Sequence, residues 1–220
     1  FPPMSGRFNN PFNEWIGAQM RGAICGMVAP GNPELAAKLA WYDGEVSHAN
    51  NGILGEIFNA VMVSLAFVNN DVRDIVQKAI NMIPKDSEYY SVITFALEKC
   101  KEHENWRDAL RECEEKYIKY NWIHAYPNAC AEIIALWYGQ GDYEKTLHII
   151  TMAGIDVDCN AAQIMAILGI QQGTKGIPEK FIHPAFDNLI TYLRGKKEIS
   201  LDELVEKTVI SIKNAKLGLG

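Results

Sequence analysis

The sequence predicts an all-α protein. Apolar residues recur at helical spacing in nearly every segment, and helix caps or breakers stand between the segments. No stretch of any length alternates apolar and polar residues as a half-buried strand would. The 220 residues contain no internal repeat and no linker, so we expect one domain over residues 1–220.

The N-terminal segment is expected to begin as an extended loop over residues 1–13, which are rich in Pro, Gly and Asn. A first helix is expected over residues 15–27. Three glycines weaken that helix by about 1 kcal/mol each relative to Ala and suggest close packing against another backbone or a ligand: Gly17, Gly22 and Gly26. Asn32 is predicted to cap the next helix, which has Pro33 in its first position.

The rest of the chain predicts a series of further helices. Residues 53–68 are strongly apolar, which favours a central helix, and Asp142 is placed to cap a later one. Ser200 and Glu203 form the capping-box pattern that opens the last helix. The other helical segments are expected over 72–82, 87–103, 106–120, 129–138, 143–152, 160–172, 186–193 and 201–215.

The composition argues against several classes of protein. A formal charge of −6 disfavours a general nucleic-acid or membrane-surface binder, because either would need a basic face. No apolar run reaches the roughly 18 residues of a transmembrane helix. The cysteines are scattered without metal-site spacing, which favours reduced thiols in a cytoplasmic protein. They are Cys25, Cys100, Cys113, Cys130 and Cys159.

Two carboxylates, Asp156 and Asp158, stand one residue apart directly before the small and apolar run 161–169. That run predicts a buried helix whose first turn begins near Asn160. One interpretation is that Asp158 or Asn160 caps the helix, because helix N-termini carry unpaired N–H groups. The other is a hard-cation site, because carboxylates held on a stiff turn suit Mg²⁺ or Ca²⁺. The spacing alone leaves both open.

The sequence around this pair resembles the closing motif of the ADP-ribosylglycohydrolase family. The usual form of that motif is G-x-D-x-D-T-x-x-A, a small-residue helix and G-x-x-x-I-P, and here it reads Gly154 to Ala162 and then Gly173 to Pro178. A second block, Ser47-His48 followed by Asn51-Gly52, also resembles the family. The likeness covers about residues 6–185, and the two blocks together are a fairly specific combination.

The resemblance implies an all-α hydrolase folded as a compact orthogonal multi-helix bundle, with a two-metal Mg²⁺ or Mn²⁺ centre. Such an enzyme removes ADP-ribose from modified proteins or cleaves small ADP-ribose conjugates. It implies that Asp156 and Asp158 are metal ligands and catalytic residues. Cys159 stands where the family usually has Thr, whose hydroxyl can join the metal shell. A thiol suits Mg²⁺ badly, so Cys159 is either a third ligand in a weakened shell or a small buried residue.

The resemblance also extends to the family's substrate loop and the helix that follows it. This implies substrate contacts at Arg7, Asn13, Gly17 and Arg21, and the Ser-His block implies another at His48. N–H groups of such a loop can hold phosphate, and Arg7 can pair with a diphosphate.

Each of these residues also has a structural interpretation. The loop can be an ordinary surface loop with Arg21 in an ion pair, and His48 can be packed in a turn. His124 is a weaker candidate for the site. Phe8, Phe12 and Trp15 either stack on adenine or belong to the core, and the core is the favoured alternative.

The family's remaining metal ligands come from an N-terminal Asp-Asp-Thr motif that has no counterpart in this chain. We therefore expect the chain to be the C-terminal portion of such an enzyme, inactive alone and completed by a missing N-terminal segment of the same protein. The alternatives are a non-catalytic ADP-ribose or nucleotide binder with a degenerate metal site, and a hydrolase of another ribosyl conjugate.

Overall fold

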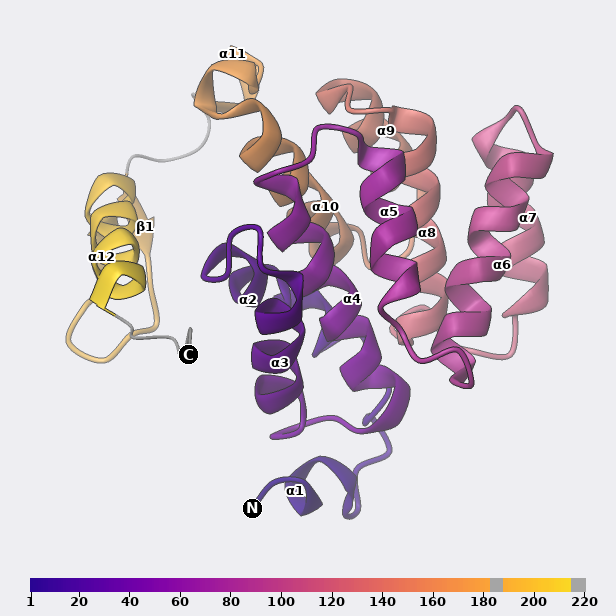
Figure 1. The fold of residues 1–220 in the computed structure, drawn as a ribbon, viewed down its shortest axis with the longest axis horizontal. Coiled ribbons are helices and arrows are strands. Elements are labelled where there is room, and N and C mark those ends of the chain that lie inside the picture. The colour runs from indigo at the N-terminus through magenta and orange to yellow at the C-terminus, as the bar shows by residue number, and fades with distance from the viewer. Residues whose placement is uncertain (183–187, 215–220) are drawn as a thin grey trace. The chain divides into compact units, whose positions relative to one another are not determined.

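The computed structural model describes residues 1–182 and 188–214, and helices make up most of this part of the chain (Figure 1). The predicted all-α fold class is confirmed. The chain divides into two compact units, Phe1–Gly176 and Ile177–Gly220. The elements of the first unit are α1 (Met4–Arg7), η1 (Gln19–Arg21), α2 (Ala23–Met27), α3 (Pro33–Gly44), α4 (Asn50–Ala66), α5 (Val72–Asn81), α6 (Glu88–Glu102), α7 (Trp106–Lys116), α8 (Ala125–Gly139), α9 (Tyr143–Ala153), α10 (Val157–Gln172) and η2 (Thr174–Gly176).

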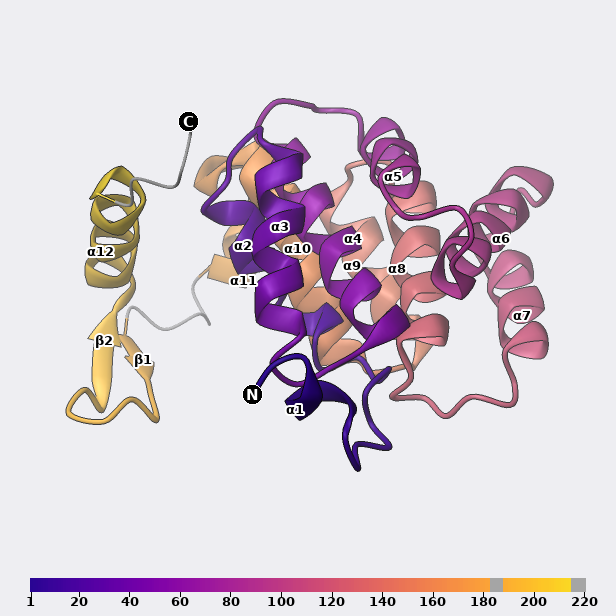
Figure 2. The same cartoon turned by 60° about the horizontal axis from the view of Figure 1, so that its bottom comes forward.

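Helix α4 is the central helix of the first unit, as the apolar run predicts. Almost all of its side chains from Gly52 to Ala66 are buried, because a helix that is apolar all round must be covered on every side. It packs against α2, α3, α5 and α10 (Figure 1). Figure 2 shows α8, α9 and α10 as neighbouring helices behind α4.

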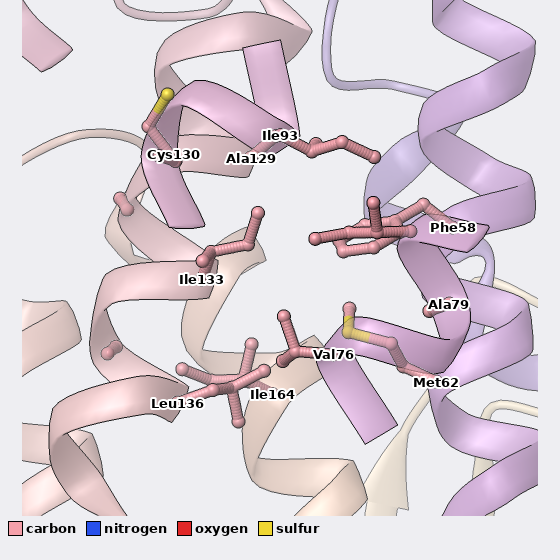
Figure 3. Packing of buried hydrophobic residues seen from close by; sticks show 14 of the residues in the cluster. Phe58, Met62, Val76, Ala79, Ile93, Ala129, Cys130, Ile133, Leu136 and Ile164 are labelled. Atoms are coloured by element: carbon pink, nitrogen blue, oxygen red, sulfur yellow. The ribbon is translucent and has the colours of Figure 1, made fainter. Parts of the chain in front are cut away.

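The core fills the space between α4, α5, α8 and α10 (Figure 3). Phe58 and Met62 of α4 face Ile133 and Leu136 of α8, and all four side chains are fully buried. Burying each such side chain contributes about 1.5–3 kcal/mol, so packing rather than surface charge stabilises the bundle. A rigid core of this kind holds the loops that carry the polar residues described below.

The predicted helix over residues 15–27 is wrong in its first part. Only the short η1 and α2 form there, and Ile16 N–H donates to the carbonyl oxygen of Ile123 (2.8 Å). The predicted close packing of the glycines is confirmed. A Cβ on Gly22 would lie 2.5 Å from the carbonyl oxygen of Glu56, and one on Gly26 would lie 2.4 Å from that of Ala60. Helix α2 therefore approaches α4 closely enough to exclude a side chain.

Local capping fixes several helix starts. The Asn32 side chain accepts from Leu35 N–H at 3.1 Å, and the Asp142 side chain accepts from Lys145 N–H at 2.7 Å, as predicted. Helix α8 begins at Ala125, four residues before the predicted start, because His124 Nδ1 caps it by accepting from Tyr126 N–H at 3.3 Å.

The second unit contains α11 (Glu179–Ile182), β1 (Asn188–Ile190), β2 (Glu198–Ser200) and α12 (Leu201–Asn214). The predicted helix over 186–193 is wrong where the structure describes it, because residues 188–190 pair with 198–200 as an antiparallel hairpin. Strands of three residues are too short to produce a periodic signal. Positions 186 and 187, and the predicted helix end at residue 215, lie outside the described residues.

The last helix begins as predicted. Ser200 Oγ accepts from Glu203 N–H at 3.1 Å, while the Glu203 carboxylate pairs with Lys196 and Lys207. In the described ranges, no helix is both long and apolar enough to span a bilayer.

Candidate functional site

A cavity of about 290 Å³ lies in the first unit, where the N-terminal segment, the turn before α4 and the loop before α10 meet. Its volume is at the lower end of the range of small-molecule sites. Ser47 and His48 supply polar groups to its wall, and so does Asp156. Phe12 and Trp15 supply rings whose centroids are 4.2 Å apart. The cavity thus combines aromatic surface with a few polar groups.

Backbone hydrogen bonds hold the N-terminal segment in place along this cavity. The carbonyl oxygen of Asn13 accepts from Ala49 N–H at 3.0 Å, and that of Glu14 accepts from Ala125 N–H at 3.1 Å. Asn10 Nδ2 donates to the carbonyl oxygen of Ser47 at 2.8 Å. These contacts come from parts of the chain far apart in sequence, so the wall is built by the tertiary fold.

Arg21 is held within the protein next to the cavity. Its Nε pairs with the Asp43 carboxylate, Nη1 donates to the carbonyl oxygen of Gly17 (3.1 Å), and Nη2 donates to Ser47 Oγ (2.9 Å). Glu56 Oε2 lies 3.8 Å from Nη2, and burial raises the pKa of Glu56 to about 9. Glu56 is therefore protonated at neutral pH, and Asp43 balances the guanidinium charge.

The hydrogen bond of Arg21 favours one of the two neutral tautomers of His48. A guanidinium can only donate, so Ser47 Oγ accepts from Arg21 and its own hydrogen is free to be donated. His48 Nδ1 lies 2.8 Å from that oxygen and is placed to accept this hydrogen. In the neutral imidazole the remaining hydrogen is then on Nε2.

The neutral form of His48 is favoured. Its side chain is nearly buried, and burial together with the Arg21 charge lowers the pKa of His48 to about 4. Gly17 faces the ring edge, since a Cβ at that position would lie 3.0 Å from Nε2. His48 therefore presents an N–H donor at the cavity and carries no charge at neutral pH.

The loop that carries Asp156 leads into α10. This helix begins at Val157, so its predicted start near Asn160 is wrong by three residues. The capping interpretation is also wrong, because the N-cap residue is Asp156 and no side chain makes a capping hydrogen bond there. Instead Asn160 is buried, and its Nδ2 donates to the carbonyl oxygen of Ile155 (3.0 Å) and to Asn128 Oδ1 (2.7 Å). Asn160 thus fixes the loop to α8 from inside.

Asp156, Asp158 and Cys159 converge at the start of α10. One ligand atom from each lies within 4.8 Å of the others. Burial raises the pKa of Asp156, and the neighbouring charge of Asp158 adds to the effect. Burial also raises the pKa of the Cys159 thiol to about 12, helped by the Asp156 carboxylate. A divalent cation would relieve this repulsion, so the carboxylates fit a metal ion. The thiol does not fit the all-oxygen shell that Mg²⁺ prefers.

A layer of buried polar side chains lies under this group. Glu132 Oε1 accepts from Gln19 Nε2 (3.2 Å) and Gln163 Nε2 (3.0 Å), and Asn59 Nδ2 lies 3.4 Å away. Glu132 Oε2 is buried and has no hydrogen-bond partner. Burial raises the pKa of Glu132 to about 8. The sequence carried a signal for this layer, because Glu132 stands alone inside an apolar helix where a charge is costly.

The structure brings only part of the predicted set to the cavity. Asp156, Gly17 and His48 line it, with Cys159 contacting Met20 of its wall. Asp158 is exposed beside Asp156. Three other predicted residues take different places: Arg21 acts through Ser47, Asn13 contributes its backbone, and Arg7 is exposed on α1 outside the cavity lining.

The aromatic residues and His124 also differ from expectation. The prediction that Phe8 and Phe12 belong to the core is wrong, since their side chains are 70% and 52% exposed. Phe12 and the partly buried Trp15 line the cavity instead. His124 caps α8 and is not part of the lining. Sequence reasoning missed Asn10, Met20 and Ile123, whose positions depend on long-range packing.

The fold and the site define a mostly helical protein with a small-molecule cavity bordered by Asp156, one of two carboxylates at a helix start. The model of the ADP-ribosylglycohydrolase family matches residues 2–212. The chain belongs to the ADP-ribosylglycohydrolase family, whose members are glycosyl hydrolases. Searches among curated proteins and among solved structures gave no match.

Proposed function

We propose that the chain binds ADP-ribose conjugates in the cavity beside Asp156 and takes part in hydrolysis of their glycosidic bond. The observation that carries this proposal is a single cavity with His48 in one part of its wall and Asp156 in another. Family membership supplies the class of reaction.

The chain's own residues have separable roles in this proposal. His48 Nε2–H donates to a phosphate or ribose oxygen, and because the imidazole is neutral it remains a directed donor rather than a point charge. Phe12 and Trp15 offer a ring surface for the base, and stacking of this kind is worth about 1–3 kcal/mol per base.

Asp156 and Asp158 hold a divalent cation at the ribose end of the ligand in this proposal. Such a cation supplies charge withdrawal from the leaving group and activation of a water molecule. Asn160 keeps the loop rigid, so that the Asp156 carboxylate stays directed to the cavity.

A second candidate is an ADP-ribose binder without turnover. It is favoured by the composition of the cluster, in which only two carboxylates and one thiol converge at this place in the described part of the chain. On either proposal, a two-metal centre needs acidic ligands beyond these three residues. We expect the 220 residues alone to bind Mg²⁺ weakly and to show no turnover.

Two measurements test the proposal. Calorimetric titration with ADP-ribose is expected to show binding, and Trp15→Ala is expected to weaken it roughly tenfold while Trp106→Ala, outside the cavity, leaves it unchanged. Absence of binding by the folded wild-type protein would refute both candidates. Assays with ADP-ribosyl-arginine, ADP-ribosyl-serine and O-acetyl-ADP-ribose, with and without EDTA, are expected to show no turnover by the 220 residues alone. Turnover that EDTA suppresses would contradict this expectation and would rule out the binder without turnover.

A further inference from the structure

Two sulfur atoms lie beside the carboxylate pair Asp156 and Asp158. Cys159 Sγ belongs to the cluster with Asp156 and Asp158, and Met20 Sδ lies 3.4 Å from it. Met20 comes from η1, which is 139 residues away in sequence, and it lines the cavity together with Asp156. The tertiary fold therefore places a thiol and a thioether beside the two carboxylates.

A buried acid is joined to the helix that carries Cys159. Glu132 of α8 is fully buried. One of its oxygens, Oε2, has no hydrogen-bond partner. Gln163, one helical turn after Cys159 on α10, holds the other oxygen at 3.0 Å. A buried carboxylate oxygen without a partner is costly, and a cation in contact with this layer would compensate it.

The donor set distinguishes between classes of metal. Mg²⁺ requires a near-octahedral shell of oxygen atoms and keeps several waters, whereas Zn²⁺ accepts thiolate and carboxylate together in a four-coordinate shell. Thiolate and thioether are soft ligands, which lower affinity for Mg²⁺ relative to thiophilic cations. The Cys159 thiol donates to Met20 Sδ at 3.4 Å, so a second soft atom borders this side of the cluster.

We propose that the site formed by Asp156, Asp158 and Cys159 selects a thiophilic divalent cation of the Zn²⁺ class over Mg²⁺, with the Cys159 thiolate as a direct ligand. The thiol proton leaves to solvent as the sulfur–metal bond forms. This inference rests on the metal position in the proposed function but does not depend on turnover.

Titration with Co²⁺, a spectroscopic substitute for Zn²⁺, tests the inference. The wild-type protein is expected to develop a thiolate-to-cobalt charge-transfer band that saturates at one equivalent and is removed by Zn²⁺ but not by excess Mg²⁺. Cys159→Ser is expected to lose the band and to weaken Zn²⁺ binding at least tenfold, whereas the matched control Cys100→Ala, at a buried thiol on α6, keeps both. Cys159→Thr is expected to shift the preference towards Mg²⁺.

A wild-type protein without the band, or equal Zn²⁺ affinity of wild type and Cys159→Ser, would overturn the inference. A measurement on the wild type alone covers the case in which a variant fails to fold. Zn²⁺ is expected to protect Cys159 from alkylation at least tenfold more than Mg²⁺ does, and equal protection would contradict thiolate ligation. ADP-ribose titration without metal reports separately on the proposed function.

Discussion

Ser47→Ala tests the hydrogen-bond chain from Arg21 to His48. The substitution removes the hydroxyl that accepts from Arg21 at 2.9 Å and donates to His48 Nδ1 at 2.8 Å. Arg21 keeps its bonds to Gly17 and Asp43, so the main loss is the donor to the nearly buried Nδ1. An unsatisfied buried acceptor costs about 1–3 kcal/mol, and we expect a fall of that size in the free energy of unfolding.

The same change is expected to weaken ligand binding. Without Ser47 the hydrogen of neutral His48 is no longer assigned to Nε2, and the ring is no longer held in place. Losing one such hydrogen bond to the ligand, at about 0.5–1.5 kcal/mol, raises the Kd for ADP-ribose roughly two- to tenfold. Ser47→Thr keeps the hydroxyl and should behave like the wild type.

Nitrogen-15 NMR of the imidazole ring reads the tautomer directly, with the His48 signals assigned by comparison with His48→Gln. We expect an Nε2–H tautomer near neutral pH in the wild type and in Ser47→Thr, and a loss of that preference in Ser47→Ala. An Nδ1–H tautomer in the wild type would refute the argument. So would wild-type ADP-ribose affinity in a folded Ser47→Ala protein.

Three further predictions address other parts of the structure. The pKa of Glu132 is raised from 4.5 to about 8 in the folded state, so its contribution to stability is complete below about pH 4.5 and is lost as the pH rises towards 8. The free energy of unfolding of Glu132→Gln, measured with denaturant, should therefore rise by at least about 1 kcal/mol relative to that of the wild type between pH 5.5 and pH 8.5. A difference that does not change with pH would contradict the raised pKa of Glu132. Gly26→Ala places a Cβ 2.4 Å from the carbonyl oxygen of Ala60 and should lower the free energy of unfolding by about 2–3 kcal/mol. Gly154→Ala is the control: its backbone is strained at φ +71° but has no neighbour within 4 Å, and the change should cost about 1 kcal/mol. Equal melting temperatures of the two variants would contradict the close packing at Gly26. Gly17→Ala, with its Cβ 3.0 Å from His48 Nε2, should weaken ADP-ribose binding roughly tenfold with little effect on thermal unfolding, and unchanged affinity would place the ligand elsewhere.

Several features of the fold follow from the sequence because they depend on neighbours along the chain. The caps at Asn32 and Asp142 join side chains to N–H groups three residues ahead, so residue type and spacing predict them. The convergence of Asp156, Asp158 and Cys159 is of the same kind, since one loop and one helical turn bring these residues together. Helix α4 was also predictable, because an apolar run of that length is covered on all sides.

Features that join distant segments were not predictable. The helix expected over residues 15–27 gives way to η1, α2 and backbone pairing with residues 123–125, because tertiary hydrogen bonds outweigh a helix weakened by glycine. The hairpin of the second unit is too short to carry a period. The exposure of Phe8 and Phe12 was also not predictable. Residues of a loop have no periodicity that would show whether an aromatic side chain lies in the core or lines a cavity.

The sequence by itself therefore determined the helical class, most helix positions and the carboxylate pair, since each depends on residues within a turn or two of one another. Only the tertiary structure decided that His48 and Asp156 border one cavity, that Met20 contacts Cys159, and that Gln163 of α10 donates to the buried Glu132 of α8. The physical reason is that helix packing sets these contacts: side chains must interdigitate across α4, α8 and α10, and no local pattern records which residues will face each other.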